Sequence, residues 1–157
     1  MKIRFVLISC AAAVIWCPPA RAAEPIEVTN AVLVEVDSLD AHGARIVTLQ
    51  PAATVTPGDL VIYAIAYRNP GNQAVSDLQI NNPLAASLEY VGPQGGPEPL
   101  VSADGVRFAR LLELTIAEAE HPARPALPSD VRHLRWSLSS AVAAGHGGEV
   151  AFRARLK

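Results

Sequence analysis

The stretch "GDLVIYAIAYRNPGN", residues 58–72, determines the fold because it places a long apolar run between two turn motifs. Alternate residues of a strand point to opposite faces. One face of this run holds Val61, Tyr63, Ile65 and Tyr67, and the other holds Leu60, Ile62, Ala64 and Ala66. A strand with two apolar faces is covered on both sides, or its outer face meets a partner. We expect neighbouring side chains or the N-terminal segment to cover Leu60 and Ile62; the alternative is that a partner docks on Leu60, Ile62, Ala64 and Ala66.

The run ends in "NPGN", residues 69–72, a motif typical of a turn between strands. Pro70 fixes φ at about −65°, as position i+1 of a turn requires, and Gly71 can supply the positive φ of position i+2. We therefore predict a type II turn, with the side chains of Asn69 and Asn72 bonded to the local backbone.

Four further runs alternate between apolar and polar residues with a period of two, at 32–36, 78–82, 133–138 and 149–156. One apolar and one polar face is the pattern of a half-buried strand. Turns rich in Pro, Gly and Asn separate the runs, and the chain shows no alternation of strands with helices. These features predict an all-β, antiparallel β-sandwich of about seven strands.

Residues 107–121, "RFARLLELTIAEAEH", are harder to assign. The segment is rich in good helix formers, and its larger apolar residues recur at helical spacing, at Phe108, Leu111, Leu112 and Ile116. Taken alone, the segment fits a helix as well as a strand. The proline-rich stretch that follows it is expected to be loop or extended chain.

The N-terminus has the layout of a secretory signal peptide. Lys2 and Arg4 precede an apolar run at 5–17, and a small-x-small site allows cleavage after Ala22. The apolar run is shorter than the roughly 20 residues of a membrane-spanning helix, which disfavours an uncleaved anchor. We therefore expect a leader at 1–22, one domain at 23–157, and a periplasmic or extracellular location.

Cleavage changes the charge and removes both cysteines, Cys10 and Cys17. The chain loses Lys2, Arg4 and Arg21 of its 13 basic residues but none of its 15 acids, so the net charge moves from −2 to −5. An acidic chain without Lys or Arg clusters disfavours nucleic acid and anionic membranes as partners. No disulfide and no thiolate nucleophile is expected without cysteine.

Motifs for catalysis or metal binding are weak. A nucleophile elbow, Gly-x-Ser-x-Gly, does not occur, and the four histidines lack the spacing of zinc ligands, at His42, His121, His133 and His146. The aspartates best placed for calcium are Asp37, Asp40 and Asp104, but no EF-hand spacing surrounds them. We expect no catalytic residues, no cofactor and no metal site.

Residues 55–91, "VTPGDLVIYAIAYRNPGNQAVSDLQINNPLAASLEYV", resemble the bacterial domain-of-unknown-function family numbered eleven, an Ig-like repeat domain. The matching residues are Pro57, Gly58, Asp59, Tyr63, Asn69, Gly71 and Tyr90. Residues 135–156 resemble the Trp-containing strand, the turn and the final strand of that family. Residues 102–116 and 124–136 resemble its short, single-domain, secreted subgroup from Gram-negative bacteria.

The resemblance implies an Ig-like β-sandwich at the cell surface or envelope, and it brings no established catalytic residues. It also favours a strand at 113–116. Two features depart from the family pattern. "NNPL" replaces the usual Asp-x-Leu-Pro, and the outer face of the 60–67 strand is apolar instead of Thr-rich.

Two hypotheses for function follow. The first is a non-catalytic, exported Ig-like module that contacts an envelope or surface protein, through the Leu60/Ile62 face or a sheet edge. The second is a ligand-binding protein or enzyme with a loop-built site in residues 92–130. A pocket there with His121, His133 or Asp130 at a perturbed pKa would favour the second hypothesis.

Overall fold

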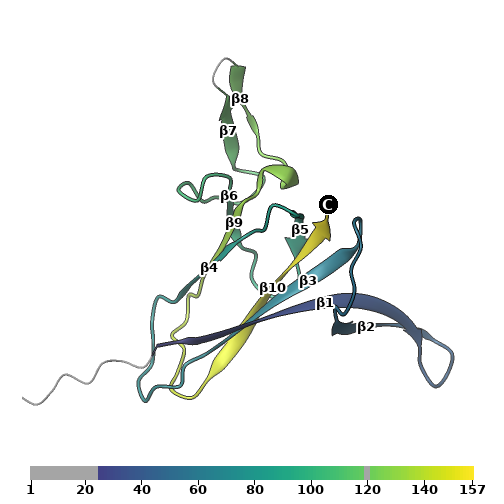
Figure 1. Ribbon diagram of the computed structural model, residues 1–157. Helices are drawn as coiled ribbons and strands as arrows, with labels where there is room; N and C mark the ends of the chain where they lie inside the picture. The colour runs from purple at the N-terminus through teal and green to yellow at the C-terminus, as the bar shows by residue number, and fades with distance from the viewer. Residues whose placement is uncertain (1–24, 119–120) are drawn as a thin grey trace, which may run out of the picture.

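A computed structural model of the protein describes residues 25–118 and 121–157 (Figure 1). The leader expected at 1–22 lies outside these residues. The described chain forms strands and one short 3-10 turn, η1, at Pro128–Asp130. No helix within these ranges is long and apolar enough to cross a membrane.

Two antiparallel sheets form the body of the molecule. The larger has the strand order β2-β1-β3-β10-β5, with bounds Arg45–Pro51, Glu27–Leu39, Leu60–Arg68, Gly147–Leu156 and Leu88–Pro93. The smaller has the order β4-β9-β6, with bounds Gln79–Pro83, His133–Ser137 and Leu100–Ser102. A separate hairpin of β7 (Thr115–Glu118) and β8 (His121–Pro125) projects from the smaller sheet (Figure 1).

The core lies between the two sheets and is built around Phe152 of β10, which is fully buried. Its ring stacks on Tyr63 of β3, with 5.2 Å between centroids. Trp136 of β9 and Tyr90 of β5 contact the same ring at 6.1 Å and 6.4 Å. Aromatic pairs of this kind add to the free energy gained by burying their area. Phe152 therefore connects three strands of the larger sheet to the centre of the smaller one.

The antiparallel β-sandwich predicted from the sequence is confirmed. The strands expected at 32–36, 60–67, 78–82, 133–138 and 149–156 all form, as β1, β3, β4, β9 and β10. The described residues contain ten strands instead of about seven. The additional strands include β2 and the β7–β8 hairpin, both of which are largely exposed and so lack a clear apolar alternation.

The described part of the 107–121 segment, residues 107–118 and 121, forms no helix. Ala109 bridges to Val101, a single turn follows in which the Glu113 N–H donates to Arg110 O, and β7 begins at Thr115. The helical spacing was misleading because Leu112 points into solvent, 97% exposed. The strand implied for 113–116 by the family resemblance is present but shifted by two residues.

The "NPGN" turn is built around Asn69, and the predicted type II geometry is wrong. Gly71 is not among the residues with positive φ. Instead, the Asn69 side-chain amide donates to Gln73 O at 2.7 Å and to Val142 O at 2.9 Å, and its oxygen accepts from the Gly71 N–H at 3.1 Å. Asn69 is buried, so these bonds satisfy its polar atoms and fasten the β3–β4 loop to the β9–β10 loop.

Candidate functional site

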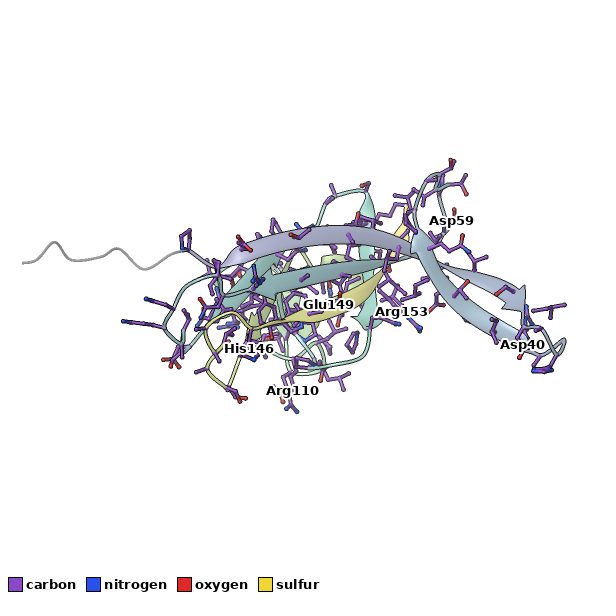
Figure 2. The ribbon with its side chains drawn as sticks, turned by 90° about the horizontal axis from the view of Figure 1, so that it is seen from below. Asp40, Asp59, Arg110, His146, Glu149 and Arg153 are labelled. Carbon is purple, nitrogen blue, oxygen red and sulfur yellow. The ribbon has the colours of Figure 1, made fainter. Side chains whose placement is uncertain are left out.

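The β1–β2 hairpin extends beyond the body of the sandwich, and Asp40 lies at its tip (Figure 2). The register runs without interruption from the Leu33–Pro51 pair to the Leu39–Arg45 pair. Strand β3 pairs with β1 only as far as Val34, so the outer half of β1 is paired with β2 alone. The hairpin therefore presents β2 as a seven-residue edge strand.

The turn of the hairpin is fixed by Asp40. Its carboxylate accepts hydrogen bonds from the N–H groups of His42 and Ala44, both at 2.8 Å, and Gly43 takes the positive φ that the turn requires. Asp40, one of the candidate calcium ligands, is thus engaged in the turn. Within residues 25–118 and 121–157, no group of three or more His, Asp or Glu side chains could hold a metal ion.

The backbone of β2 presents hydrogen-bonding groups to solvent at alternate residues. Just beyond the strand, the Ala52 N–H donates to Val32 O, so Ala52 faces β1. In a regular antiparallel ladder the residues that face the neighbour alternate with residues that face away. The N–H and C=O groups of Val47 and Leu49 therefore point away from β1. Pro51 is also an outward position, where its missing N–H costs the sheet no internal hydrogen bond.

Four apolar side chains lie on the outer face of this hairpin and beside it. We call them the hairpin surface: Leu39 (71% exposed), Val47 (59%), Leu49 (47%) and Leu60 (42%). A hollow of about 420 Å³ is lined by Val34, Glu35, Val47, Thr54, Asp59 and Leu60. Exposed apolar residues that lie together mark sites of interaction more often than scattered ones do.

The loop at residues 56–59 borders the hollow and is held by hydrogen bonds within the loop and to β10. The Asp59 carboxylate accepts from the Thr56 N–H at 2.8 Å and from its hydroxyl at 2.9 Å, and these bonds lower the pKa of Asp59. Gly58 N–H donates to Leu156 O at 2.7 Å, and Leu156 N–H donates back to Asp59 O at 3.0 Å. Leu60 follows directly, so its position at the edge of the hollow is fixed by β10.

The face of Leu60, Ile62, Ala64 and Ala66, for which coverage by neighbours was expected and a docked partner was the alternative, is mostly covered. Ile62 is 3% exposed and Ala64 5%, in a small cluster with Ala151 and Leu33. Above Ile62, the Arg153 guanidinium forms an ion pair with Glu35 at 2.5 Å. Leu60 and Ala66 are exposed, but they lie at opposite ends of β3. The side chains of β1 and β10 thus cover Ile62 and Ala64, and Leu60 belongs to the hairpin surface.

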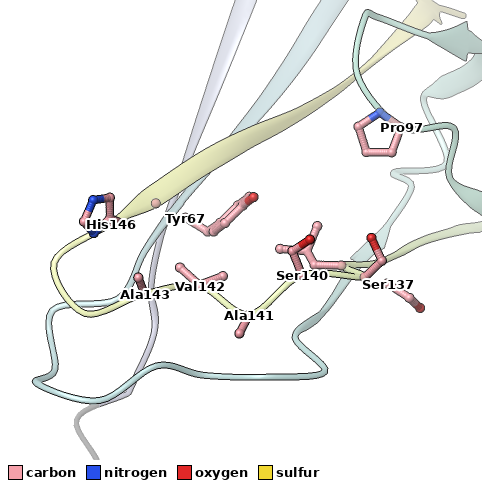
Figure 3. Close-up of a pocket in the computed structure, with 11 residues that line it drawn as sticks. Tyr67, Pro97, Ser137, Ser140, Ala141, Val142, Ala143 and His146 are labelled. Carbon is pink, nitrogen blue, oxygen red and sulfur yellow. The ribbon is translucent and has the colours of Figure 1, made fainter.

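A second cavity of about 410 Å³ opens at the other end of the sandwich (Figure 3). Tyr67 points into it, and Ser137 at the end of β9 lines it together with Ser139, Ser140 and His146 of the loop between β9 and β10. The His146 ring nitrogen Nδ1 lies 2.9 Å from Ala144 O, and none of the described lining residues is a carboxylate. A Ser-His-acid arrangement needs an acid that orients the histidine. The lining residues supply hydroxyl groups but not that set.

The loop region 92–130 contains perturbed carboxylates with structural partners. Asp130 accepts two hydrogen bonds from Arg124, at 2.6 Å and 3.0 Å, and one from the Leu127 N–H, which lower its pKa to about 2. Asp104 accepts from the N–H groups of Val106 and Arg107, which lower its pKa to about 2. Both carboxylates hold turns in the charged form. His133 packs beside Gly105, and the side chain of His121 lies outside the described residues.

Sequence reasoning named Leu60 and a sheet edge as docking sites, but it missed the rest of the hairpin surface and the Tyr67 cavity. The run "RIVTLQP" at 45–51 has the β-branched composition of a strand, and this pattern could have identified β2. Its position at the edge depends on pairing with β1, which the sequence does not show. The position of the Tyr67 side chain depends on Gly148, where a Cβ would lie 2.5 Å from the Tyr67 hydroxyl.

Comparison of the chain with protein-family models, with curated proteins and with solved structures finds no match.

Proposed function

We propose that this chain is a non-catalytic, exported Ig-like module that acts by binding another protein through the hairpin surface. The observation that carries the proposal is the exposed edge of β2, where outward backbone groups lie beside four exposed apolar side chains. Edge strands of this kind bind added strands through main-chain hydrogen bonds and gain specificity from alternate side chains.

Two features of the sequence support the rest of the proposal. The leader pattern at 1–22 supports export to the periplasm or the cell exterior. The resemblance to the Ig-like family supports a role in the envelope without catalysis. The proposed partner is therefore an envelope or surface protein, and neither nucleic acid nor membrane insertion is part of the proposal.

The experiment places a photo-crosslinking amino acid at Val47 and, as a control, at Leu112. Both side chains are apolar and exposed, but Leu112 lies far along the chain in the turn before β7. Irradiation of cells that express the full chain should give protein adducts from position 47 and none from position 112. Absence of adducts from position 47, with the protein folded and exported, would overturn the proposal.

A further inference from the structure

We propose that the strand bound by β2 is the β2 strand of a second copy of this chain, antiparallel to it and related by a two-fold axis at Thr48. The two five-stranded sheets would then form one continuous sheet across the dimer. This inference rests on the proposed function, because it names the partner of the same hairpin surface.

The backbone groups of β2 are complementary to themselves in this register. A two-fold axis at Thr48 places Val47 opposite Leu49 of the second copy. Both residues point their N–H and C=O groups outward, so each such pair can exchange two hydrogen bonds. Arg45 falls opposite Pro51 of the second copy, where the Arg45 N–H can donate to the Pro51 C=O but proline has no N–H to donate to the Arg45 C=O. Each of these terminal pairs therefore makes one hydrogen bond, while the two central Val47–Leu49 pairs make two each.

The side chains are complementary in the same register. Val47 and Leu49 both lie on the outer face, so each apolar side chain meets the other type in the second copy. Residues 46–51 carry no charge. The two Arg45 side chains would lie at opposite ends of the pairing, about 20 Å apart along the strands. Salt screens charges at that separation.

Two other registers keep the same outward groups, and both are less favourable. A shift by two residues in one direction places Arg45 opposite Leu49 of the second copy, so that a charged side chain lies against an apolar one. A shift by two residues in the other direction places Val47 opposite Pro51, which has no N–H to donate, and shortens the ladder. The charge of Arg45 and the missing N–H of Pro51 thus favour the axis at Thr48.

The other edge of the same sheet explains why the pairing closes at two copies. In β5, Val91 is an extra residue, because Ala154 pairs with Tyr90 while Arg153 pairs with Gly92. The strand also ends in Pro93, and η1 packs beside it. A bulge and a proline block the addition of another strand. A head-to-tail contact of β2 with β5 would extend without limit, and these features of β5 oppose it.

The first test measures the mass of the full chain, purified from a host that exports it, by sedimentation equilibrium. A dimer in reversible exchange with monomer is expected. Leu49→Lys places a charge opposite Val47 of the second copy and should raise the dissociation constant at least about 10-fold, since 1.4 kcal/mol corresponds to that factor. Val91→Lys makes the same change of charge at an exposed residue of the opposite edge and should leave the dissociation constant unchanged.

The second test determines which residues of β2 pair with each other between the two copies. Residue 48 faces its own counterpart in a non-hydrogen-bonded pair, whose Cα separation of about 4.5 Å suits a disulfide. In a background with Cys10→Ala and Cys17→Ala, Thr48→Cys should therefore give a covalent dimer on mild oxidation. Gln50→Cys should not, because residue 50 would oppose Ile46, about 13 Å from residue 50 of the second copy.

The outcomes separate this inference from the proposed function. A monomer at the highest concentration attainable, or a Leu49→Lys dimer as tight as the parent, would overturn the inference. Equal crosslinking by Thr48→Cys and Gln50→Cys would overturn the register. If photo-adducts from position 47 contain a different protein while the pure chain stays monomeric, the proposed function stands and the second copy is the wrong partner. If position 47 gives no adducts with a second copy and none with another protein, the inference and the proposed function both fail.

Discussion

The two edges of the larger sheet differ in almost every property that controls strand addition. The β5 edge is anchored in the core by Leu88 and Tyr90, interrupted by a bulge at Val91, and closed by Pro93. The β2 edge is regular, exposed along its length, and apolar at Val47 and Leu49. Proteins commonly protect their edge strands against pairing. This chain protects β5 and leaves β2 open, which is what a binding edge requires.

The largest expected effect is a difference in the free energy of unfolding between a substitution on β5 and one on β2. Leu88→Ala removes a buried side chain of β5 and leaves a cavity, which should lower the free energy of unfolding by about 2 to 5 kcal/mol. Leu49→Ala on β2 removes a half-exposed side chain and should change the free energy of unfolding by no more than about 0.5 kcal/mol. Urea denaturation of both variants, under conditions where the parent is monomeric, checks the difference. Equal losses would show that β2 belongs to the core as much as β5 does.

A smaller effect separates neighbouring residues of one strand. Ile62→Thr buries a hydroxyl beneath Leu33 and the Glu35–Arg153 ion pair, and should cost about 1 to 3 kcal/mol. Leu60→Thr changes a half-exposed residue of the hairpin surface and should cost less than about 1 kcal/mol. Thermal unfolding of the single variants checks both values. A partner-binding defect in Leu60→Thr alone, with Ile62→Thr defective only in stability, would assign binding to the hairpin surface.

The smallest effect concerns the turn η1, which packs beside the protected edge. The folded-state pKa of Asp130 is lowered to about 2, from an ordinary value of 3.8, by the hydrogen bonds from Arg124 and Leu127. A lowered pKa stabilises the fold above pH 4, and this contribution disappears as the pH falls toward 2. The pair is partly exposed, so Asp130→Asn should cost less than about 1 kcal/mol at pH 7.

The cost of the same variant should shrink as the pH falls toward 2, because the parent carboxyl becomes protonated as the pH approaches and passes its folded-state pKa. Thermal unfolding between pH 2 and pH 7 tests the convergence of the two curves. Glu149→Gln, which neutralises an exposed carboxylate of β10, serves as the control. A deficit in Asp130→Asn that is independent of pH would show that shape, and not charge, holds this turn.

The sequence predicted the strands that bury one face, because burial imposes a period of two on their residues. It failed where burial is weak. Residues 107–121 combine helix formers with a turn whose leucine, Leu112, is 97% exposed, so their local composition left helix and strand equally open. The positive φ of Gly71 was predicted from its residue type alone. The conformation of the loop is instead determined by Asn69, whose side chain donates to Val142 O, 73 residues away.

The candidate site was predicted only in part. Leu60 was singled out as an apolar residue on the outer face, but the expectation that neighbouring side chains cover it was wrong, because it is 42% exposed. Ile62 and Ala64 share its pattern but are covered by Leu33 and Ala151, which come from strands 29 residues before and 87 residues after them in sequence. Coverage of this kind depends on strand order, and a single sequence with no alignment does not contain that order.

The position of β10 has a consequence for how the chain acquires its shape. This strand follows all the other described strands in sequence, yet it lies between β3 and β5 and carries Phe152 into the centre of the core. Until it arrives, β5 has no neighbour in its sheet, and the edge of β3 that faces away from β1 stays unpaired. Contacts between such distant segments slow folding. We expect a chain that stops before residue 147 to yield no smaller stable unit, and the complete one to remain dependent on protection from aggregation until its final strand is inserted.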